Sequence, residues 1–182
     1  MSRLAVDKIV GANTESIVDF SSITSLKMPT GSVIQVQSTT KTDTFSANSA
    51  QIQAVTGLSV DITPKFSTSK VFITADVNGS VDNAARGYVA LYKDGSALVQ
   101  GDASGSRVRA STQLAGADNG EALSCTVSFL DSPATTSSVS YQIYLVGEGS
   151  STQVHVNRSH NDADATGRGR FASTITAMEI SQ

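Results

Sequence analysis

The chain has 182 residues, of which 39% are hydrophobic and 16% charged, and its formal net charge at pH 7 is -3. This length suits one ordinary domain with a small appendage, and the composition differs from that of a disordered protein. A net negative charge gives no basic face for nucleic acid, and no apolar run approaches the ~20 residues of a membrane span. Residues 1–7 lack the apolar run of a signal peptide, so we expect neither export by that route nor membrane insertion.

Residues 1–32 carry apolar side chains without helical or strictly alternating spacing. A segment of this size cannot bury them by itself, so they must pack on the rest of the chain, on other copies, or on a docking protein. We interpret it as an attachment and oligomerisation segment. Its apolar residues include Leu4, Val6, Ile9, Val10 and Phe20.

Residues 33–182 have the pattern of an all-β head domain. Short runs rich in Val, Ile, Thr, Tyr and Phe alternate with Gly, Asn, Asp, Ser or Pro, and no window has a convincing helical period. We count roughly nine to eleven strands, a density typical of antiparallel β-sandwiches and jelly rolls. No fixed-period repeat is present, which disfavours a β-helix.

Several segments alternate between an apolar and a polar face. In 71–77, Thr74 and Asp76 share one face, and the other carries the expected core residues Val71, Ile73, Ala75 and Val77. Segments 141–145 and 173–180 alternate similarly, although either face of 173–180 could be the buried one.

Turn chemistry divides the strands. Asp94-Gly95 predicts a tight hairpin between 88–92 and 97–99, and Thr63-Pro64 closes the run 57–62. Two further turns are predicted at Asn78-Gly79 and Asn119-Gly120.

The polar segment 155–167 contains the two histidines of the chain, His155 and His160. Residues 162–167 match the first half of a calcium-loop template, but its last position holds Ser173 where a bidentate Glu is required. No G-x-S-x-G elbow is present. We therefore expect an exposed loop with no catalytic residue, cofactor or metal, and a cation site or host-receptor contact is the alternative.

A family resemblance runs along nearly the whole chain. Residues 28–36 (MPTGSVIQV) and 40–45 (TKTDTF) resemble the opening of a head domain of bacteriophage tail-fibre and minor virion structural proteins. The likeness continues through ITP at 62–64, SKV at 69–71, RG at 86–87, KDG at 93–95, GDA at 101–103, FLDSP at 129–133, VNR at 156–158 and STITAMEI at 173–180. Residues 2–10 (SRLAVDKIV) resemble the short N-terminal segments of such proteins.

The resemblance implies a non-enzymatic, homotrimeric virion protein assembled in the host cytoplasm. Residues 1–32 would attach it to another virion protein, and the head, 33–182, would contact a glycan or protein of the host surface. Loops carry recognition, so we expect the host-facing residues in loops of the head. The candidates are Asn78, Asp82, Arg86, His155, Asn157, Arg158, His160, Asp162 and Asp164.

Two alternatives stay open. The same fold could serve as a capsid decoration or head-fibre trimer that clamps shell subunits. A carbohydrate-binding module or short depolymerase is the alternative from another class, because paired carboxylates in a cleft leave no sequence motif.

Overall fold

The computed structural model describes residues 28–48, 51–82, 85–115 and 122–182. These residues form eleven strands, and no helix among them is long and apolar enough to cross a membrane. The strands are β1 (Val33–Lys41), β2 (Phe45–Asn48), β3 (Gln53–Ile62), β4 (Lys70–Val81), β5 (Arg86–Lys93), β6 (Ser96–Val99), β7 (Thr112–Ala115), β8 (Leu123–Asp131), β9 (Val139–Gly147), β10 (Gln153–Val156) and β11 (Ser173–Ile180).

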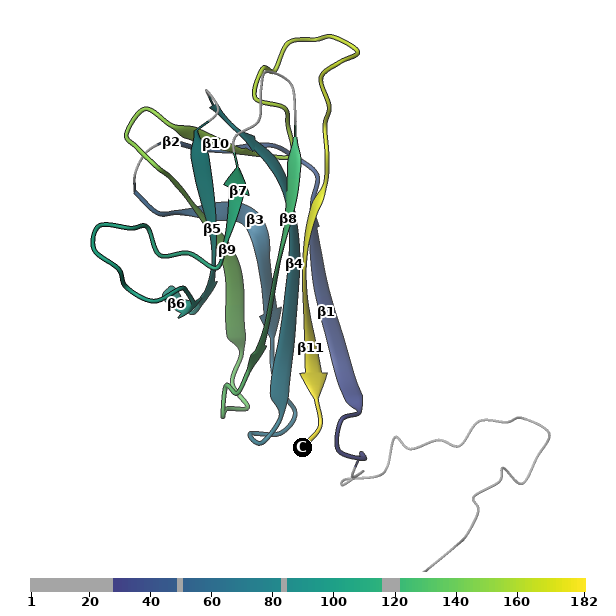
Figure 1. Ribbon diagram of the computed structural model, residues 1–182. Coiled ribbons are helices and arrows are strands. Elements are labelled where there is room, and N and C mark those ends of the chain that lie inside the picture. Colours follow the sequence, from purple (N-terminus) through teal and green to yellow (C-terminus); the bar gives the residue numbers. More distant parts are fainter. Residues whose placement is uncertain (1–27, 49–50, 83–84, 116–121) are drawn as a thin grey trace, which may run out of the picture.

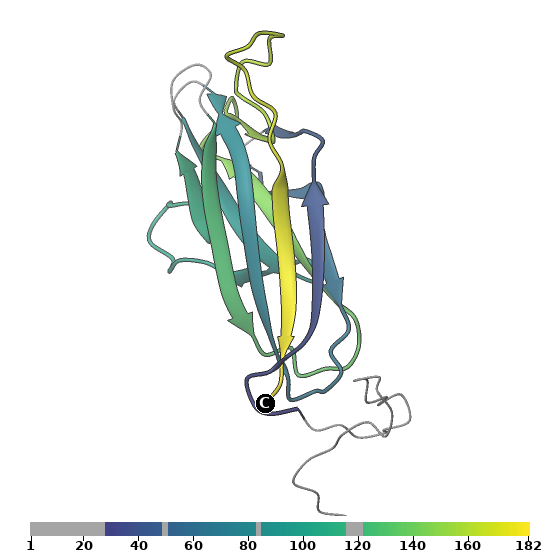
Figure 2. The same ribbon diagram turned by 90° about the vertical axis from the view of Figure 1, so that its right-hand side faces the viewer.

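The strands build two antiparallel sheets that pack face to face (Figures 1 and 2). One sheet has the order β1-β11-β4-β10-β2, with β8 also paired to β4. The other has the order β3-β9-β5-β6, with β7 also paired to β5. Each sheet takes strands from both halves of the chain, as in a jelly roll. The expectation of an all-β sandwich is therefore confirmed.

The core lies between the sheets and follows the predicted alternation. The predicted face of β4 is buried, as are the apolar side chains of Tyr141, Ile143 and Leu145 on β9. On β11 the buried face is the one with Ile175 and Ala177, which decides the question that alternation left open. Burying a side chain of the size of valine or isoleucine stabilises the fold by about 1.5–3 kcal/mol. The core residues in β4 are Val71, Ile73, Ala75, Val77 and Val81.

The predicted hairpin is present as β5 and β6. Its turn residues Asp94 and Gly95 have φ angles of 48° and 77°, the positive values that an Asp-Gly hairpin turn needs. The other predicted boundary is also correct, because β3 ends at Ile62, directly before Thr63-Pro64.

The prediction of a turn at Asn78-Gly79 is wrong, because both residues lie inside β4. Gly79 pairs with Leu123 of β8 on one side and with Val156 of β10 on the other. A Cβ atom on Gly79 would lie 2.1 Å from the carbonyl oxygen of His155. The glycine thus permits the close approach of β10, and no turn is involved. Asn119-Gly120 lies outside the described residues.

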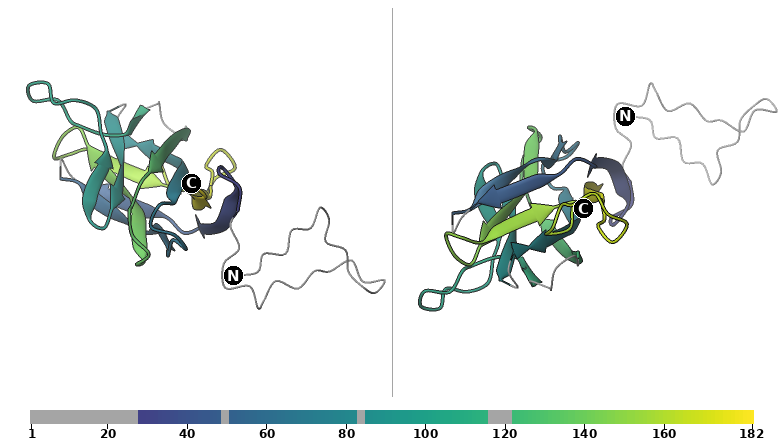
Figure 3. Two further views of the ribbon diagram at one scale, coloured as in Figure 1. Left: turned by 90° about the horizontal axis from the view of Figure 1, so that it is seen from below. Right: turned by 90° about the horizontal axis from the view of Figure 1, so that it is seen from above.

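The two ends of the sandwich differ. At the lower end of Figure 1, residues 28–32 lead into β1 beside the C-terminus, where Gly31 N donates to Ser181 O (2.8 Å) and Ser181 N to Ser32 O (2.9 Å). Figure 3 shows the same neighbourhood from below. The end of β4, the start of β5 and the long connection between β10 and β11 lie at the opposite end (Figure 1).

Candidate functional site

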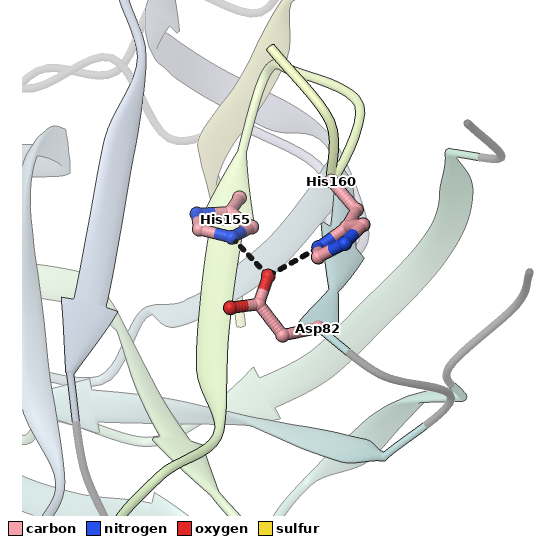
Figure 4. Close-up of side chains that lie close together, drawn as sticks. All are labelled: Asp82, His155 and His160. Carbon is pink, nitrogen blue, oxygen red and sulfur yellow. Dashed lines mark hydrogen bonds and ion pairs between the residues drawn. The ribbon is translucent and has the colours of Figure 1, made fainter. Parts of the chain in front are cut away.

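A polar cluster lies at this opposite end, where three separate segments meet. Asp82 directly follows β4, His155 is in β10, and His160 is in the connection from β10 to β11. Figure 4 shows the Asp82 carboxylate between the two imidazole rings. Asp82 Oδ1 lies 2.7 Å from His155 Nε2 and also hydrogen-bonds to His160 Nδ1. We call these three residues the His-Asp-His cluster.

Strand pairing positions His155. Val154 pairs with Val81 of β4, and both Val154 and Val156 point into the core. Alternation therefore directs the His155 side chain to the other face of the sheet. The side chain is nevertheless only 1% exposed, because the chain folds back over it after β10.

Asn157 makes that reversal. Its φ angle is 62°, in the left-handed region that Asn adopts more readily than most residues. Its amide N donates to Asn78 O (2.8 Å), and its carbonyl accepts from Phe171 N (3.1 Å). The connection is further closed by an antiparallel bridge between Arg158 and Arg170.

Two side chains contact the far nitrogen of His155. Ser46 Oγ on β2 lies 2.8 Å from Nδ1, and Arg158 Nη2 also lies 2.8 Å from it. The Arg158 guanidinium forms an ion pair with Asp162 as well (3.3 Å), and Asp162 in turn binds Arg170. Positive and negative charges therefore alternate outward from the cluster.

The environment fixes the protonation of two cluster residues. Burial raises the pKa of Asp82, but hydrogen bonds from His155 and His160 outweigh it and hold that pKa below its ordinary value. Burial, together with the Arg158 charge, lowers the pKa of His155 against the opposing effect of Asp82. At neutral pH Asp82 is thus a carboxylate and His155 a neutral imidazole.

The serine, histidine and aspartate are connected in the order of a hydrolytic relay, Ser46–His155–Asp82. A relay needs the imidazole to accept a proton from the serine. Here the Arg158 cation lies beside the same nitrogen and opposes that protonation. The three donor atoms of the His-Asp-His cluster, in contrast, lie within 4.8 Å of one another, close enough to share one metal ion.

The structure brings together five of the predicted host-facing residues: Asp82, His155, Arg158, His160 and Asp162. Arg86 begins β5 and forms an ion pair with Glu148 (3.1 Å), and Asp164 is exposed in the β10–β11 connection.

Three of the candidates require a correction. His155 and Asn157 are buried, and Asn78 lies inside β4 with its side-chain amide bonded to Ala172 O. In the described conformation these residues do not face outward from loops. The attachment residues Leu4, Val6, Ile9, Val10 and Phe20 lie outside the described residues.

Ser46 was not among the residues expected from the sequence, and it lies 109 residues from His155 in the chain. Asp82 was a candidate, but only as a loop residue, and it is 73 residues from His155. No local spacing links positions this far apart, so pairing of β2, β10 and β4 is what unites them.

Comparisons with known proteins identify no family. No family model and no curated protein matches the sequence. Among solved structures, one similar chain comes from the structure of infectious bursal disease virus Gx strain, with 16% identity and a TM-score of 0.39. The match covers 81% of this chain and 38% of the viral chain, so this chain spans well under half the length of that one. A likeness of this size assigns no function.

Proposed function

We propose that the protein is a structural component of a tailed-phage particle, a tail-fibre-like appendage. Residues 1–32 would attach it to another virion protein, and the sandwich would present its opposite end to the host surface. The sequence resemblance suggests this role, and the placement of the two ends of the sandwich is the structural observation that carries it.

The first described residue is Met28, whose carbonyl accepts a hydrogen bond from Ser181 Oγ (3.3 Å) at the lower end of the sandwich. Attachment through the preceding residues would leave the opposite end free. That end carries Asp164 and its exposed neighbours in the β10–β11 connection, beside the His-Asp-His cluster. A polar, hydrogen-bonded surface of this kind suits contact with a glycan or a polar protein surface.

A row of apolar side chains supports a homotrimer as part of this proposal. Strand register aligns one residue from each of β1, β11, β4 and β8 across the outer face of the six-stranded sheet, and we call these four the apolar row: Val36, Met178, Phe72 and Leu130. The two outer members, Val36 and Leu130, are 51% and 47% exposed. Exposed, contiguous apolar surface is a mark of protein interfaces.

Copies of the chain are the occupants that best explain the apolar row. The row lies near the foot of β1, where residues 28–32 join it. Three copies that meet there would have their attachment segments together at one end of the trimer. A stable interface needs about 800 Å² per partner, which the face of a four-stranded sheet can supply.

We also propose that the protein is not an enzyme. The serine-histidine-aspartate connection within the described residues has a cation beside the nitrogen that would have to accept the proton. An esterase assay with p-nitrophenyl acetate should give the same rate for the wild type and for Ser46→Ala. A rate that depends on Ser46 would contradict this part of the proposal.

The test of the proposed role is the location of the protein in the particle. Gold-labelled antibodies against residues 90–100, which include the exposed β5–β6 turn, are applied to purified particles and viewed by electron microscopy. Label at the tail supports the appendage. Label over the icosahedral faces would assign the protein to capsid decoration, and binding on a glycan array without any particle label would favour a carbohydrate-binding module.

A further inference from the structure

The His-Asp-His cluster offers a metal ion three donors from three different segments. Asp82 follows β4, His155 is in β10, and His160 is in the β10–β11 connection. Their donor atoms, Oδ1, Nε2 and Nδ1, lie within 4.8 Å of one another. Zinc binds such donors at about 2.0–2.2 Å, which places tetrahedral ligands about 3.3 Å apart. Asp82 Oδ1 lies 2.7 Å from His155 Nε2 and also hydrogen-bonds to His160 Nδ1, so this oxygen must move away from both nitrogens to admit an ion between them.

The chemistry of the donors indicates which ion. We propose that Asp82, His155 and His160 bind a divalent first-row transition ion, with Zn²⁺ as the expected occupant. Two imidazoles and one carboxylate suit zinc, iron, nickel and cobalt, whereas Mg²⁺ and Ca²⁺ prefer sites built of oxygen.

Two of the three proposed ligands are partly exposed. The His155 side chain is 1% exposed, whereas the side chains of Asp82 and His160 are 17% and 23% exposed. When an ion is bound, water would complete its coordination beside these two partly exposed ligands.

Ser46 is placed to orient the buried ligand. When Nε2 of His155 binds the ion, the ring proton must lie on Nδ1. Ser46 Oγ lies 2.8 Å from Nδ1 and can accept a hydrogen bond from it. Such partners of a metal-bound histidine fix its tautomer and ring orientation.

Arg158 is the group that opposes a cation. Its Nη2 lies 3.2 Å from His155 Nε2, the proposed ligand atom, and 2.8 Å from Nδ1, which would carry the ring proton. The guanidinium must therefore withdraw from both nitrogens when the ion binds. Asp162 already holds the other side of that guanidinium and can retain it. Removing the Arg158 charge should therefore tighten metal binding, whereas removing a ligand should abolish it.

A bound ion would hold the β10–β11 connection against the ends of β4 and β10. An ion that binds the folded state alone also raises stability, in proportion to the logarithm of its concentration relative to its dissociation constant. Metal binding does not depend on the proposed virion role, and it is tested without particles or host.

The experiment uses the tag-free, full-length protein, stripped with EDTA and titrated with Zn²⁺ by calorimetry. The protein must carry no polyhistidine tag, because the tag would itself bind Zn²⁺ and obscure binding by the two histidines of the chain. We expect one ion per chain. In ¹⁵N-histidine NMR spectra, the expected result is a zinc-induced shift of Nε2 in His155 and Nδ1 in His160, the two proposed ligand nitrogens.

Matched variants separate ligands from neighbours. Asp82→Asn and His160→Ala should lose saturable binding, and Asp164→Asn, in the same connection but outside the cluster, should bind like the wild type. Ser46→Ala should weaken binding about tenfold. Arg158→Gln should strengthen it, a gain that damage to the fold would not produce. Circular dichroism checks that each variant is folded.

Several outcomes would overturn the proposal. These are no one-to-one binding in the wild type, undiminished affinity in His160→Ala, or zinc titration that shifts neither imidazole. Equally tight binding of Mg²⁺ would contradict the assignment to a transition ion. If both ligand variants fail to fold, the wild-type NMR shifts and the Arg158→Gln affinity decide the question.

Discussion

Gly79 controls the close approach of two strands that carry the site. Any side chain there would collide with the backbone of β10, because its Cβ would lie 2.1 Å from His155 O and 3.2 Å from His155 C. Gly79→Ala should therefore displace β10 from β4 and lower the free energy of unfolding by at least about 2 kcal/mol.

Urea denaturation of Gly79→Ala measures this loss. Gly101→Ala is the matched control, since a Cβ at Gly101 would meet nothing within 4 Å. Its stability should stay within about 0.5 kcal/mol of the wild type. Equal stability of the two variants would contradict the steric explanation for Gly79.

Glu179 is a fully buried carboxylate at the lower end of the sandwich. It accepts hydrogen bonds from Gln35 Nε2 (2.6 Å) and from the backbone amides of Lys65 (2.8 Å) and Phe66 (3.3 Å). Burial raises the pKa of Glu179, but these hydrogen bonds outweigh it and hold the pKa below its ordinary value of 4.5. The carboxylate thus joins β11 to β1 and to the segment after β3.

The lowered pKa of Glu179 predicts the direction of a pH effect. Its contribution to stability is complete above about pH 5, where the unfolded chain is also ionised, and it is lost as pH falls through the folded-state pKa. Glu179→Gln should cost about 1–3 kcal/mol at pH 7 and progressively less below pH 4.5. Urea unfolding across pH 3–7 checks this, with exposed Glu148→Gln as the control. A constant difference across that range would refute the ionised state.

Asn157 connects several elements around the end of β10. Its Nδ2 donates to the carbonyls of Lys41 (2.8 Å) and Asp43 (3.0 Å), and its Oδ1 accepts from Ser173 Oγ (2.7 Å). The side chain thereby ties the ends of β1 and β10 to the start of β11. Buried polar groups of this kind are costly to leave without partners.

Asn157→Ala should lower the free energy of unfolding by about 2–4 kcal/mol. The substitution removes the hydrogen-bond partner of two carbonyls and a hydroxyl, and it places alanine at a positive φ angle. Hydrogen exchange should show faster opening of residues 158–171 than in the wild type. The control is Asn161→Ala in the same connection, where the exposed side chain accepts a local hydrogen bond from Ala163 N. Unchanged exchange in Asn157→Ala would contradict the role given to this residue.

At the scale of the whole molecule, the outer faces of the two sheets decide how copies can associate. The apolar row crosses four strands of the six-stranded sheet, and the next row along the face consists of Ser and Thr residues. An association through this face would bury its apolar part and leave the sandwich core unchanged.

Light scattering tests this association. The full-length protein should have about three times the 18.8 kDa mass of the chain. The double variant Val36→Asp, Leu130→Asp should be monomeric, whereas Val108→Asp, also at an exposed apolar residue but outside the row, should keep the wild-type mass. A truncated protein that starts at Ser32 shows whether the attachment segment is needed. A monomeric wild type would remove the trimer from the proposal.

Properties set by neighbours in the chain could be predicted from sequence. Alternation is one of them, because successive side chains of a strand point to opposite faces, and it identified the core faces of β4 and β9. The Asp94-Gly95 hairpin is another, because positive φ angles are a local demand. The same reasoning failed at Gly79, where the demand for glycine comes from a strand 76 positions further along (His155).

The amino-acid sequence by itself thus determined the fold class, the hairpin at Asp94-Gly95, the end of β3 at Ile62 and the polar character of segment 155–167. Only the tertiary structure decided which face of β11 is buried, that His155 and Asn157 lie inside, and that Asp82, His155 and His160 form a cluster with Ser46 beside it. The physical reason is distance along the chain. The contacts of the cluster join residues 73 to 109 positions apart, and they exist because β2, β4 and β10 pair side by side in one sheet.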